Sequence, residues 1–400
     1  MTADKNKLDP FIAEAIYPDP GAIFSARYKS VEEIKNTCMI VLDTNALLVP
    51  YAIGKDSLQQ IRYTYEKLIE ENRLVIPSQV AREFAKNRAG KLGELFQQFN
   101  RKLSGLSKLH KGRYPLLEEL ETYQIVLKLE SEIDTLQVEY KKAIQKVISD
   151  IRNWTWNDPV SLLYSDLFRE RVIHDLSIDD KDELLAQLNY RQVHNIPPGY
   201  KDSGKDDEGI GDYLIWLTIL ETGKSAIKSV LFVSGDEKAD WFHKSEKQAL
   251  YPRYELIDEF RRKTNGHSFH IVSFSTFLNL YGASDSIVQE IRKEEEKLIS
   301  TSSLEGIFVM NLKDLEIALY EKCEENNPGK MRAGQATAQQ MTNLLLEIEV
   351  ISADFYNQVK DIYYLHNRLV HKGSDSPSSV EIEKGIYTIH ELFKKLSISH

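Results

Sequence analysis

The hydrophobic pattern of the first part of the chain alternates between short apolar runs and amphipathic helical segments. Residues 37–42 form an almost continuous apolar run that ends at Asp43. Such runs are typical of strands buried on both faces of a parallel sheet. An amphipathic helix is expected next, followed by a strand at 74–76 and a further helix that Pro77 opens. The order strand, helix, strand, helix predicts a right-handed α/β unit.

Between about residues 88 and 195 the pattern changes to long, charged, helical sequence. Apolar residues recur there at steps of three and four, at Ile133, Leu136, Tyr140, Ile144, Val147 and Ile151. This spacing predicts a helical hairpin or coiled arm inserted into the α/β domain. The α/β pattern resumes afterwards, with a buried helix at 211–220 and strands at 230–233 and 270–274.

The last third of the sequence is helical and contains no internal repeat. Loops at 326–332 and 373–378 divide it. The predicted organisation is an N-terminal extension (1–36), an α/β domain (37–284), a helical connector (285–302) and a C-terminal all-α domain (303–400).

The composition is that of a globular protein with a sizeable core, with 42% hydrophobic and 28% charged residues among 400. Cys38 and Cys323 lie far apart and outside any Cys/His cluster, which argues against a zinc site or a disulfide scaffold. The N-terminus lacks the charged-then-apolar order of a signal peptide, and no apolar stretch reaches the ~18 residues of a membrane helix. We therefore expect a reduced, cytoplasmic protein without a membrane partner.

The net charge of −10 argues against indiscriminate nucleic-acid binding, although contacts to phosphate are local. Residues 86–113 carry a net charge of +7, with Glu94 as the single acid. The basic residues of this segment are Lys86, Arg88, Lys91, Arg101, Lys102, Lys108, Lys111 and Arg113. The segment is either a solvated helix face or, because it follows Glu83, a surface that contacts the phosphate backbone.

Acidic residues stand at the ends of the predicted elements. Asp43 directly follows the first apolar run, and Asp236 follows the strand at 230–233. Ligands of open parallel sheets bind beyond the carboxyl ends of the strands, so we expect these two acids to lie close together. Glu83 lies on the helix after the second strand, and Asp212 opens an otherwise apolar helix.

Four acids in one crevice repel one another unless cations neutralise them. Mg²⁺ and Mn²⁺ prefer carboxylate ligands and keep waters for chemistry. In a two-metal arrangement, one ion activates water and the other stabilises the leaving oxygen of a phosphodiester. Each acid also has a structural alternative, because Asp43 could cap a turn, Asp212 could be an N-cap, and Glu83 could be a surface helix residue.

Five motifs in order resemble the PIN-like domain family of prokaryotes. They are VLDTNALL (41–48), IPSQVAREF with the nearby Asn87 and Arg88 (76–88), PPGYKD (197–202), GDYLIW (211–216) and FVSGDEKADW (232–241). The resemblance covers roughly residues 38–281. It implies a central parallel sheet flanked by helices and a metal-dependent nuclease activity.

Carried over position by position, the resemblance also implies roles for single residues. The implied catalytic and metal-binding acids are Asp43, Glu83, Asp212 and Asp236, with Mg²⁺ or Mn²⁺ as the cofactor. Asp240 is implied as an additional or substitute acid, and Asn45 and Ser234 as residues that orient the acids and metal-bound water. The candidates for contacts to nucleic acid are Lys86, Arg88, Lys91 and Lys201.

A second resemblance lies in the C-terminal domain. The segment HNRLVHKG (366–373) resembles the Arg-Asn-Arg-x-Val-His-Gly segment of helical domains related to HEPN ribonucleases. In those nucleases an Arg precedes the catalytic-motif His, with about four residues between the two. In this chain the corresponding position holds His366 instead of Arg. Arg368 lies only three residues before His371. The alternative is a helical dimerisation or docking domain, in which Arg368 and His371 are structural and a partner protein or a second copy binds.

The favoured function is that of an endonuclease that hydrolyses phosphodiester bonds with water as the nucleophile. Its expected substrate is RNA, with a branched or single-stranded nucleic acid, including DNA, as the other possibility. A PIN-like nuclease joined to a HEPN-related domain resembles effectors of prokaryotic toxin or antiviral defence systems. A catalytically inactive PIN-like scaffold, which binds nucleic acid or a protein, is the alternative. A phosphatase of the haloacid-dehalogenase type also starts from an Asp after an apolar strand, but its general acid would stand where this chain has Asn45.

Overall fold

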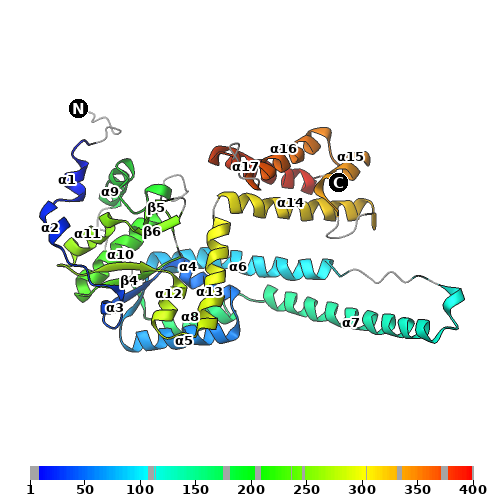
Figure 1. Cartoon of the computed structure of the whole chain (residues 1–400), viewed down its shortest axis with the longest axis horizontal. Helices are drawn as coiled ribbons and strands as arrows, with labels where there is room; N and C mark the ends of the chain where they lie inside the picture. Colours follow the sequence, from blue (N-terminus) through cyan, green and yellow to red (C-terminus); the bar gives the residue numbers. More distant parts are fainter. Residues whose placement is uncertain are drawn as a thin grey trace. The chain divides into compact units, whose positions relative to one another are not determined.

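The computed structural model of the chain describes residues 9–106, 112, 114–173, 181–202, 209–235, 237–245, 248–302, 304–330, 336–370 and 377–398. The chain forms two compact units, residues 1–295 and 296–400, which are drawn together in Figure 1. Within the described ranges, every helix is too short or too polar to cross a membrane.

The first unit is built on a five-stranded parallel sheet with the strand order β3-β2-β1-β4-β7. The strands are β1 (Met39–Leu42), β2 (Leu74–Pro77), β3 (Val172–Ile173), β4 (Val230–Val233) and β7 (Phe269–Val272). The central strands β1 and β4 are apolar and buried along their whole length, because helices cover both faces of the sheet. The predicted α/β fold with a central parallel sheet is confirmed.

The helices that pack on the sheet are α5 (Lys55–Glu70), α8 (Pro159–Phe168), α10 (Ile210–Ala226), α11 (Tyr254–Lys263) and α12 (Phe274–Leu280). Tyr65 contacts Phe168 and Phe277, so it joins α5, α8 and α12. Trp216 of α10 contacts Phe269 of β7. In Figure 1, α10 and α11 lie above the strands, and α5 and α8 lie below them.

The segment between β2 and α10 contains the predicted helical hairpin. Helices α6 (Ser78–Ser104) and α7 (Glu121–Arg152) contact each other and run in opposite directions (Figure 1). The same segment also contributes β3, which pairs in parallel with β2. The sequence did not predict this strand, because two residues are too few for a periodic pattern.

The shorter elements of the first unit are α1 (Ile12–Ile16), α2 (Pro20–Ser25), α3 (Val31–Ile34), α4 (Thr44–Leu48), α9 (Lys181–Val193) and the antiparallel hairpin of β5 (Phe242–Ser245) and β6 (Gln248–Pro252). The β5–β6 hairpin was also absent from the sequence prediction. It begins directly after the motif FVSGDEKADW, so this motif connects β4 to the hairpin.

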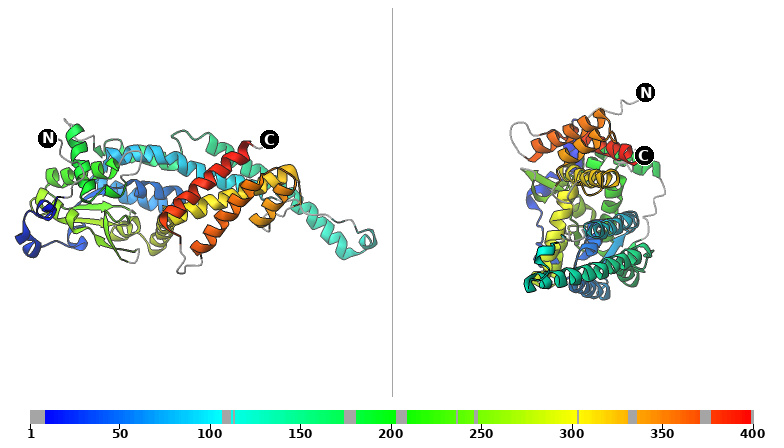
Figure 2. Two further views of the ribbon diagram at one scale, coloured as in Figure 1. Left: turned by 90° about the horizontal axis from the view of Figure 1, so that it is seen from above. Right: turned by 90° about the vertical axis from the view of Figure 1, so that its right-hand side faces the viewer.

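The second unit is helical throughout its described residues. Its helices are α14 (Leu304–Asn326), α15 (Ala338–Glu347), α16 (Ala353–Val370) and α17 (Ser379–Ile398), and the boundary between the units falls within α13 (Asp285–Ser302). In Figure 2, α14, α16 and α17 lie side by side, coloured yellow to red. This confirms the predicted all-α character of the C-terminal region.

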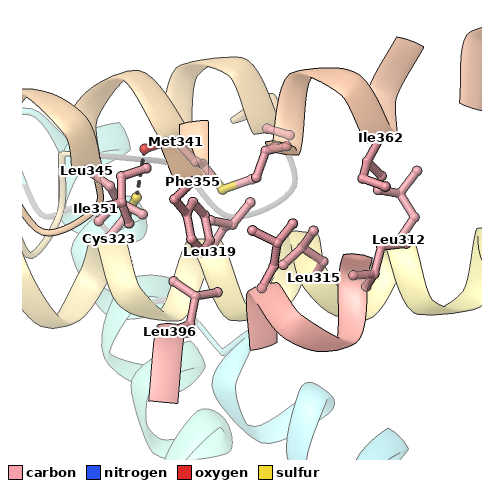
Figure 3. Close-up of a cluster of buried hydrophobic side chains, with 14 of the residues drawn as sticks. Leu312, Leu315, Leu319, Cys323, Met341, Leu345, Ile351, Phe355, Ile362 and Leu396 are labelled. Carbon is pink, nitrogen blue, oxygen red and sulfur yellow. Dashed lines mark hydrogen bonds between the residues drawn. The ribbon is translucent and has the colours of Figure 1, made fainter. Parts of the chain in front are cut away.

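A core of buried apolar side chains holds the second unit together (Figure 3). Leu319 and Phe355 lie near its centre, and the thiol of Cys323 donates a hydrogen bond of 3.5 Å to the carbonyl oxygen of Met341. A Cβ on Gly385 of α17 would lie 2.8 Å from a ring carbon of Phe308. The glycine therefore lets α17 approach α14 closely.

Candidate functional site

Asp43 lies at the carboxyl end of β1 and caps helix α4. Its Oδ1 accepts a hydrogen bond of 2.7 Å from the backbone N–H of Thr44, and its Oδ2 accepts one of 2.6 Å from the hydroxyl of Ser234. The residue is 8% exposed. Asp43 therefore does cap an element, as its structural alternative predicted. Its carboxylate lies at the edge of the sheet where β1 and β4 end.

Glu83 lies in the second turn of α6, the helix that begins directly after β2. The hydroxyl of Thr44 donates a hydrogen bond of 2.6 Å to Oε2 of Glu83, and the side-chain amide of Gln79 donates one of 3.0 Å to Oε1. Thr44 thus links Asp43 and Glu83, because its N–H contacts one carboxylate and its hydroxyl the other. Sequence reasoning missed Thr44 and Gln79, although the four-residue spacing of Gln79 and Glu83 on a helix indicates a contact.

Asp212 lies in the first turn of α10, the helix that leads into β4. A helix that precedes a parallel strand begins at the carboxyl edge of the sheet, and α10 contacts β1, β4 and α6. Oδ2 of Asp212 lies 3.1 Å from Nζ of Lys238, in the segment after β4. Lys238 was not predicted as a site residue, although it stands within the motif FVSGDEKADW.

Asp236, the fourth predicted acid, lies outside the described residues. The two residues before it, Ser234 and Gly235, stand at the end of β4. A Cβ on Gly235 would lie 3.9 Å from the Cβ of Asn45, which is exposed, whereas Ser234 is buried. Asn45 and Ser234, the predicted supporting residues, are therefore at the same edge of the sheet as Asp43.

The donor atoms at this edge determine which metal ion the site could hold. Asp43 and Glu83 meet through Thr44, while Asp212 is paired with Lys238. Among the residues that the structure describes, which exclude Asp236, no three Asp, Glu, His or Cys side chains gather as a metal-binding group. The donors that do meet are carboxylate and hydroxyl oxygens, which Mg²⁺ and Mn²⁺ prefer. Oxygen donors of this kind suit Mg²⁺ or Mn²⁺. The described residues by themselves do not supply all the ligands that such an ion needs.

Asp240 is completely buried and holds the loop that contains the motif PPGYKD. Its Oδ2 accepts a hydrogen bond of 2.9 Å from the backbone N–H of Gly199, and the hydroxyl of Tyr200 donates one of 3.0 Å to the carbonyl oxygen of Ala239. Lys201 is exposed on this loop. These contacts give Asp240 a role in positioning the loop beside the segment that follows β4.

We expect Gly199→Ala to lower the free energy of unfolding by roughly 1–3 kcal/mol. Gly199 has a φ of +94°, and a Cβ there would lie 2.9 Å from the carbonyl oxygen of Gly209. Urea denaturation measures the loss. Gly90→Ala on α6 is the matched control, because its Cβ would meet nothing within 4 Å, and it should be neutral or stabilising by up to about 1 kcal/mol. If the Gly199 variant were as stable as the wild type, the backbone at residue 199 would not require a glycine.

The predicted nucleic-acid contacts of α6 divide into exposed and paired residues. Lys86 is exposed. Lys91 is partly buried, and its Nζ lies 3.0 Å from a carboxylate oxygen of Glu94. Lys86 and Lys201 are therefore the predicted cations that the structure places most openly at the surface, and Lys91 is available only in competition with Glu94.

Arg88 departs from its predicted role. It is 6% exposed, and its Nε donates hydrogen bonds to Oδ2 of Asp158 (3.0 Å) and to the hydroxyl of Ser161 (2.7 Å). The guanidinium group also lies 4.5 Å from the ring centre of Trp156. The expectation that Arg88 contacts phosphate is corrected, because its charge is neutralised within the fold, where it ties α6 to the start of α8.

The C-terminal motif also contains a structural contact. Nη1 of Arg368 on α16 lies 2.7 Å from Oε1 of Glu381 on α17. Hydrogen bonds from Arg368 and Ser378 lower the pKa of Glu381 to about 2. His371 lies outside the described residues. The described contact links two helices of the second unit, as in the alternative in which Arg368 is structural.

A family model described as a PIN like domain matches residues 39–256 of the chain. The matched span begins at β1 and contains the predicted acids. No curated protein and no solved structure matches the chain. The match does not extend to the C-terminal helices, so their resemblance to HEPN domains stays a prediction.

Proposed function

This chain belongs to the PIN-like domain family, whose members are generally nucleases, and on that basis we propose that it is an endonuclease that hydrolyses phosphodiester bonds in RNA. The observation that carries the proposal is the link between Asp43 and Glu83 through Thr44 at the carboxyl edge of β1 and β2. Ligands of open parallel sheets bind at this edge. The family match and the position of Asp43 and Glu83 therefore both support an active site at this edge of the sheet.

The acids proposed to hold one or two Mg²⁺ or Mn²⁺ ions are Asp43, Glu83, Asp212 and Asp236. Such an ion, when bound, supplies positive charge for the phosphate and lowers the pKa of water. The chain's own residues orient the acids: Ser234 donates to Asp43, Thr44 donates to Glu83, and Lys238 pairs with Asp212. In the absence of cations Lys238 also offsets part of the negative charge at this edge.

The cations proposed to contact the substrate lie on α6 and on the loop that contains the motif PPGYKD. Lys86 lies on α6 three residues after Glu83, and Lys201 lies on the loop that Asp240 holds. Phosphate contacts of this kind position a nucleic acid without reading its sequence. We propose Lys91 as a weaker contact, because Glu94 competes for it.

Incubation of the purified full-length chain with labelled RNA, single-stranded DNA and flap DNA tests the proposal. We expect cleavage of RNA with Mn²⁺ or Mg²⁺ and none with EDTA. Isothermal calorimetry with Mn²⁺ distinguishes the nuclease from the competing function, a non-catalytic scaffold. A chain that binds RNA but neither binds Mn²⁺ nor cuts any of the substrates is the non-catalytic scaffold, and that result would refute the nuclease.

We expect Thr44→Val to lower the rate constant of RNA cleavage by roughly 10- to 100-fold, the range typical for residues that orient metal ligands. Valine has nearly the volume of threonine but lacks the hydroxyl that donates to Glu83. Thr44→Ser keeps the donor and should retain most of the activity. Single-turnover cleavage at saturating enzyme measures both variants. If the valine variant cleaves as fast as the serine variant, the link through Thr44 has no catalytic role.

A role as an effector of a toxin or antiviral defence system is part of the same proposal. It is supported by the combination of a PIN-like domain with an all-α C-terminal unit. Induced expression in bacteria tests it: the wild type should arrest growth, and a chain with Asp43→Asn should not.

A further inference from the structure

Helix α7 carries an apolar stripe on a face that the rest of the first unit leaves exposed among its described residues. The stripe consists of Val126, Leu129, Ile133, Leu136, Tyr140, Ala143 and Val147. Its six larger side chains are 36% to 63% exposed, with Leu136 the most exposed. The positions are separated by three and four residues in strict alternation, which is the spacing of a coiled-coil seam.

The side of α7 that packs against α6 has a different character. Ile144, Ile148 and Ile151 are buried close to the domain. The same helical line continues outward through Glu130, Asp134 and Gln137, which are only partly covered. The outer half of the hairpin therefore covers polar positions and leaves its apolar positions in water. An amphipathic helix gains stability from its apolar face only when another element covers that face.

We propose that a second copy of this chain covers the stripe, so that the two α7 helices form a parallel two-stranded coiled coil. Three of the four first positions of the heptads hold β-branched residues, Val126, Ile133 and Val147, and the other holds Tyr140; the fourth positions hold Leu129, Leu136 and Ala143. β-Branched residues at the first position combined with leucine at the fourth favour two parallel strands. A second copy supplies the identical stripe in register, so each layer of the seam meets its own counterpart.

The charges beside the stripe favour the same arrangement. In a parallel pair, the position opposite Glu132 holds Gln137 of the second copy, and the position opposite Glu139 holds Ile144, which is buried within its own copy, so like charges do not meet. An antiparallel pair would instead set Glu132 against Glu139 of the second copy. Like charges at these flanking positions destabilise a coiled coil. The parallel arrangement is therefore the one that this sequence supports.

A parallel coil has a consequence for the position of the two candidate sites. The carboxyl-terminal end of α7 is the end that lies nearer the sheet in Figure 1, and Ile144 and Ile148 are buried in that part of the helix. Both copies would therefore carry their sheets at the same end of the coil. This inference does not depend on nuclease activity, because it rests on α7 alone.

Sedimentation velocity of the full-length chain at micromolar concentration tests the interface. We expect a dimer for the wild type and a monomer for Leu129→Glu combined with Leu136→Glu. Val138→Glu is the matched control, because Val138 is 54% exposed on the same helix but lies outside the stripe, and it should remain a dimer. Circular dichroism checks that all three chains keep the same helix content. A monomeric wild type, or a dimer that survives both glutamates, overturns the proposal.

Disulfide formation tests the parallel orientation. Cys38 and Cys323 are both buried, so an introduced cysteine is the accessible thiol among the described residues. Leu136→Cys should form a disulfide between copies under mild oxidation, because the two residues at one fourth position face each other in a parallel pair. Val138→Cys should not. A dimer in which Leu136→Cys fails to cross-link overturns the parallel coil.

Discussion

We expect Asp43→Asn to reduce the rate of the proposed RNA cleavage by roughly 100-fold or more. Loss of a residue that only orients a metal ligand typically costs roughly 10- to 100-fold, and loss of a ligand itself should cost at least as much. Asparagine keeps the shape of the side chain but removes its charge. Its amide nitrogen also cannot accept the hydrogen bond that Ser234 donates to Oδ2. Single-turnover cleavage of labelled RNA in Mn²⁺ measures the loss, and calorimetry shows whether the affinity for Mn²⁺ falls with it.

The control for Asp43 is the same exchange at an exposed acid. Asp56 lies in the first turn of α5, outside the cluster of acids, so Asp56→Asn should cleave like the wild type. The fold should survive Asp43→Asn, since the oxygen of the amide still caps α4, and the loss of one hydrogen bond costs about 0.5–1.5 kcal/mol. Undiminished cleavage by the Asp43 variant would show that the proposed site is not where hydrolysis occurs.

We expect Asp158→Ala to lower the free energy of unfolding of the first unit by about 3–5 kcal/mol. Asp158 is 1% exposed, pairs with Arg88 and accepts a hydrogen bond of 3.0 Å from the backbone N–H of Ser161 at the start of α8. Its removal leaves the buried guanidinium group without its counter-charge. Urea denaturation followed by tryptophan fluorescence measures the change.

Asp166→Ala is the matched control for Asp158. Asp166 lies on the same helix and forms an ion pair of 3.2 Å with Arg62, but its side chain is 65% exposed. Exposed ion pairs contribute about 0–1 kcal/mol, because water and salt screen them. If the two alanine variants were equally stable, the buried pair would not hold α6 to α8.

The stability of the Arg88–Asp158 pair also depends on pH. Burial by itself raises the pKa of Asp158, but hydrogen bonds from Ser161 and Arg88 outweigh it and bring the pKa below the ordinary value of 3.8. A carboxyl group whose pKa is lower in the folded state stabilises the fold above its unfolded-state pKa, and this contribution is lost as the pH falls through the folded-state pKa. The wild type should therefore lose stability below about pH 4 more steeply than Asp158→Ala.

The sequence by itself was sufficient to predict the parallel sheet and the edge where Asp43 stands. The run at 37–42 is almost continuously apolar and the run at 230–233 is wholly apolar, because both faces of β1 and β4 are buried. The structure confirms the two strands at Met39–Leu42 and Val230–Val233. Parallel strands end at one edge of a sheet. The predicted acid after β1 is therefore found at that edge.

Only the tertiary structure decided which charges meet. Arg88 belongs to a basic segment, and its burial depends on Asp158, which lies 70 residues further along the chain. In the same way, the hydroxyl of Thr44 donates its hydrogen bond to Glu83, which lies 39 residues further along the chain. The hydrophobic periodicity of a sequence indicates which side chains face the core, because the direction of a side chain follows from its position within one helix or strand. The partner of a polar group is supplied by another element, so it becomes known only when the elements pack together.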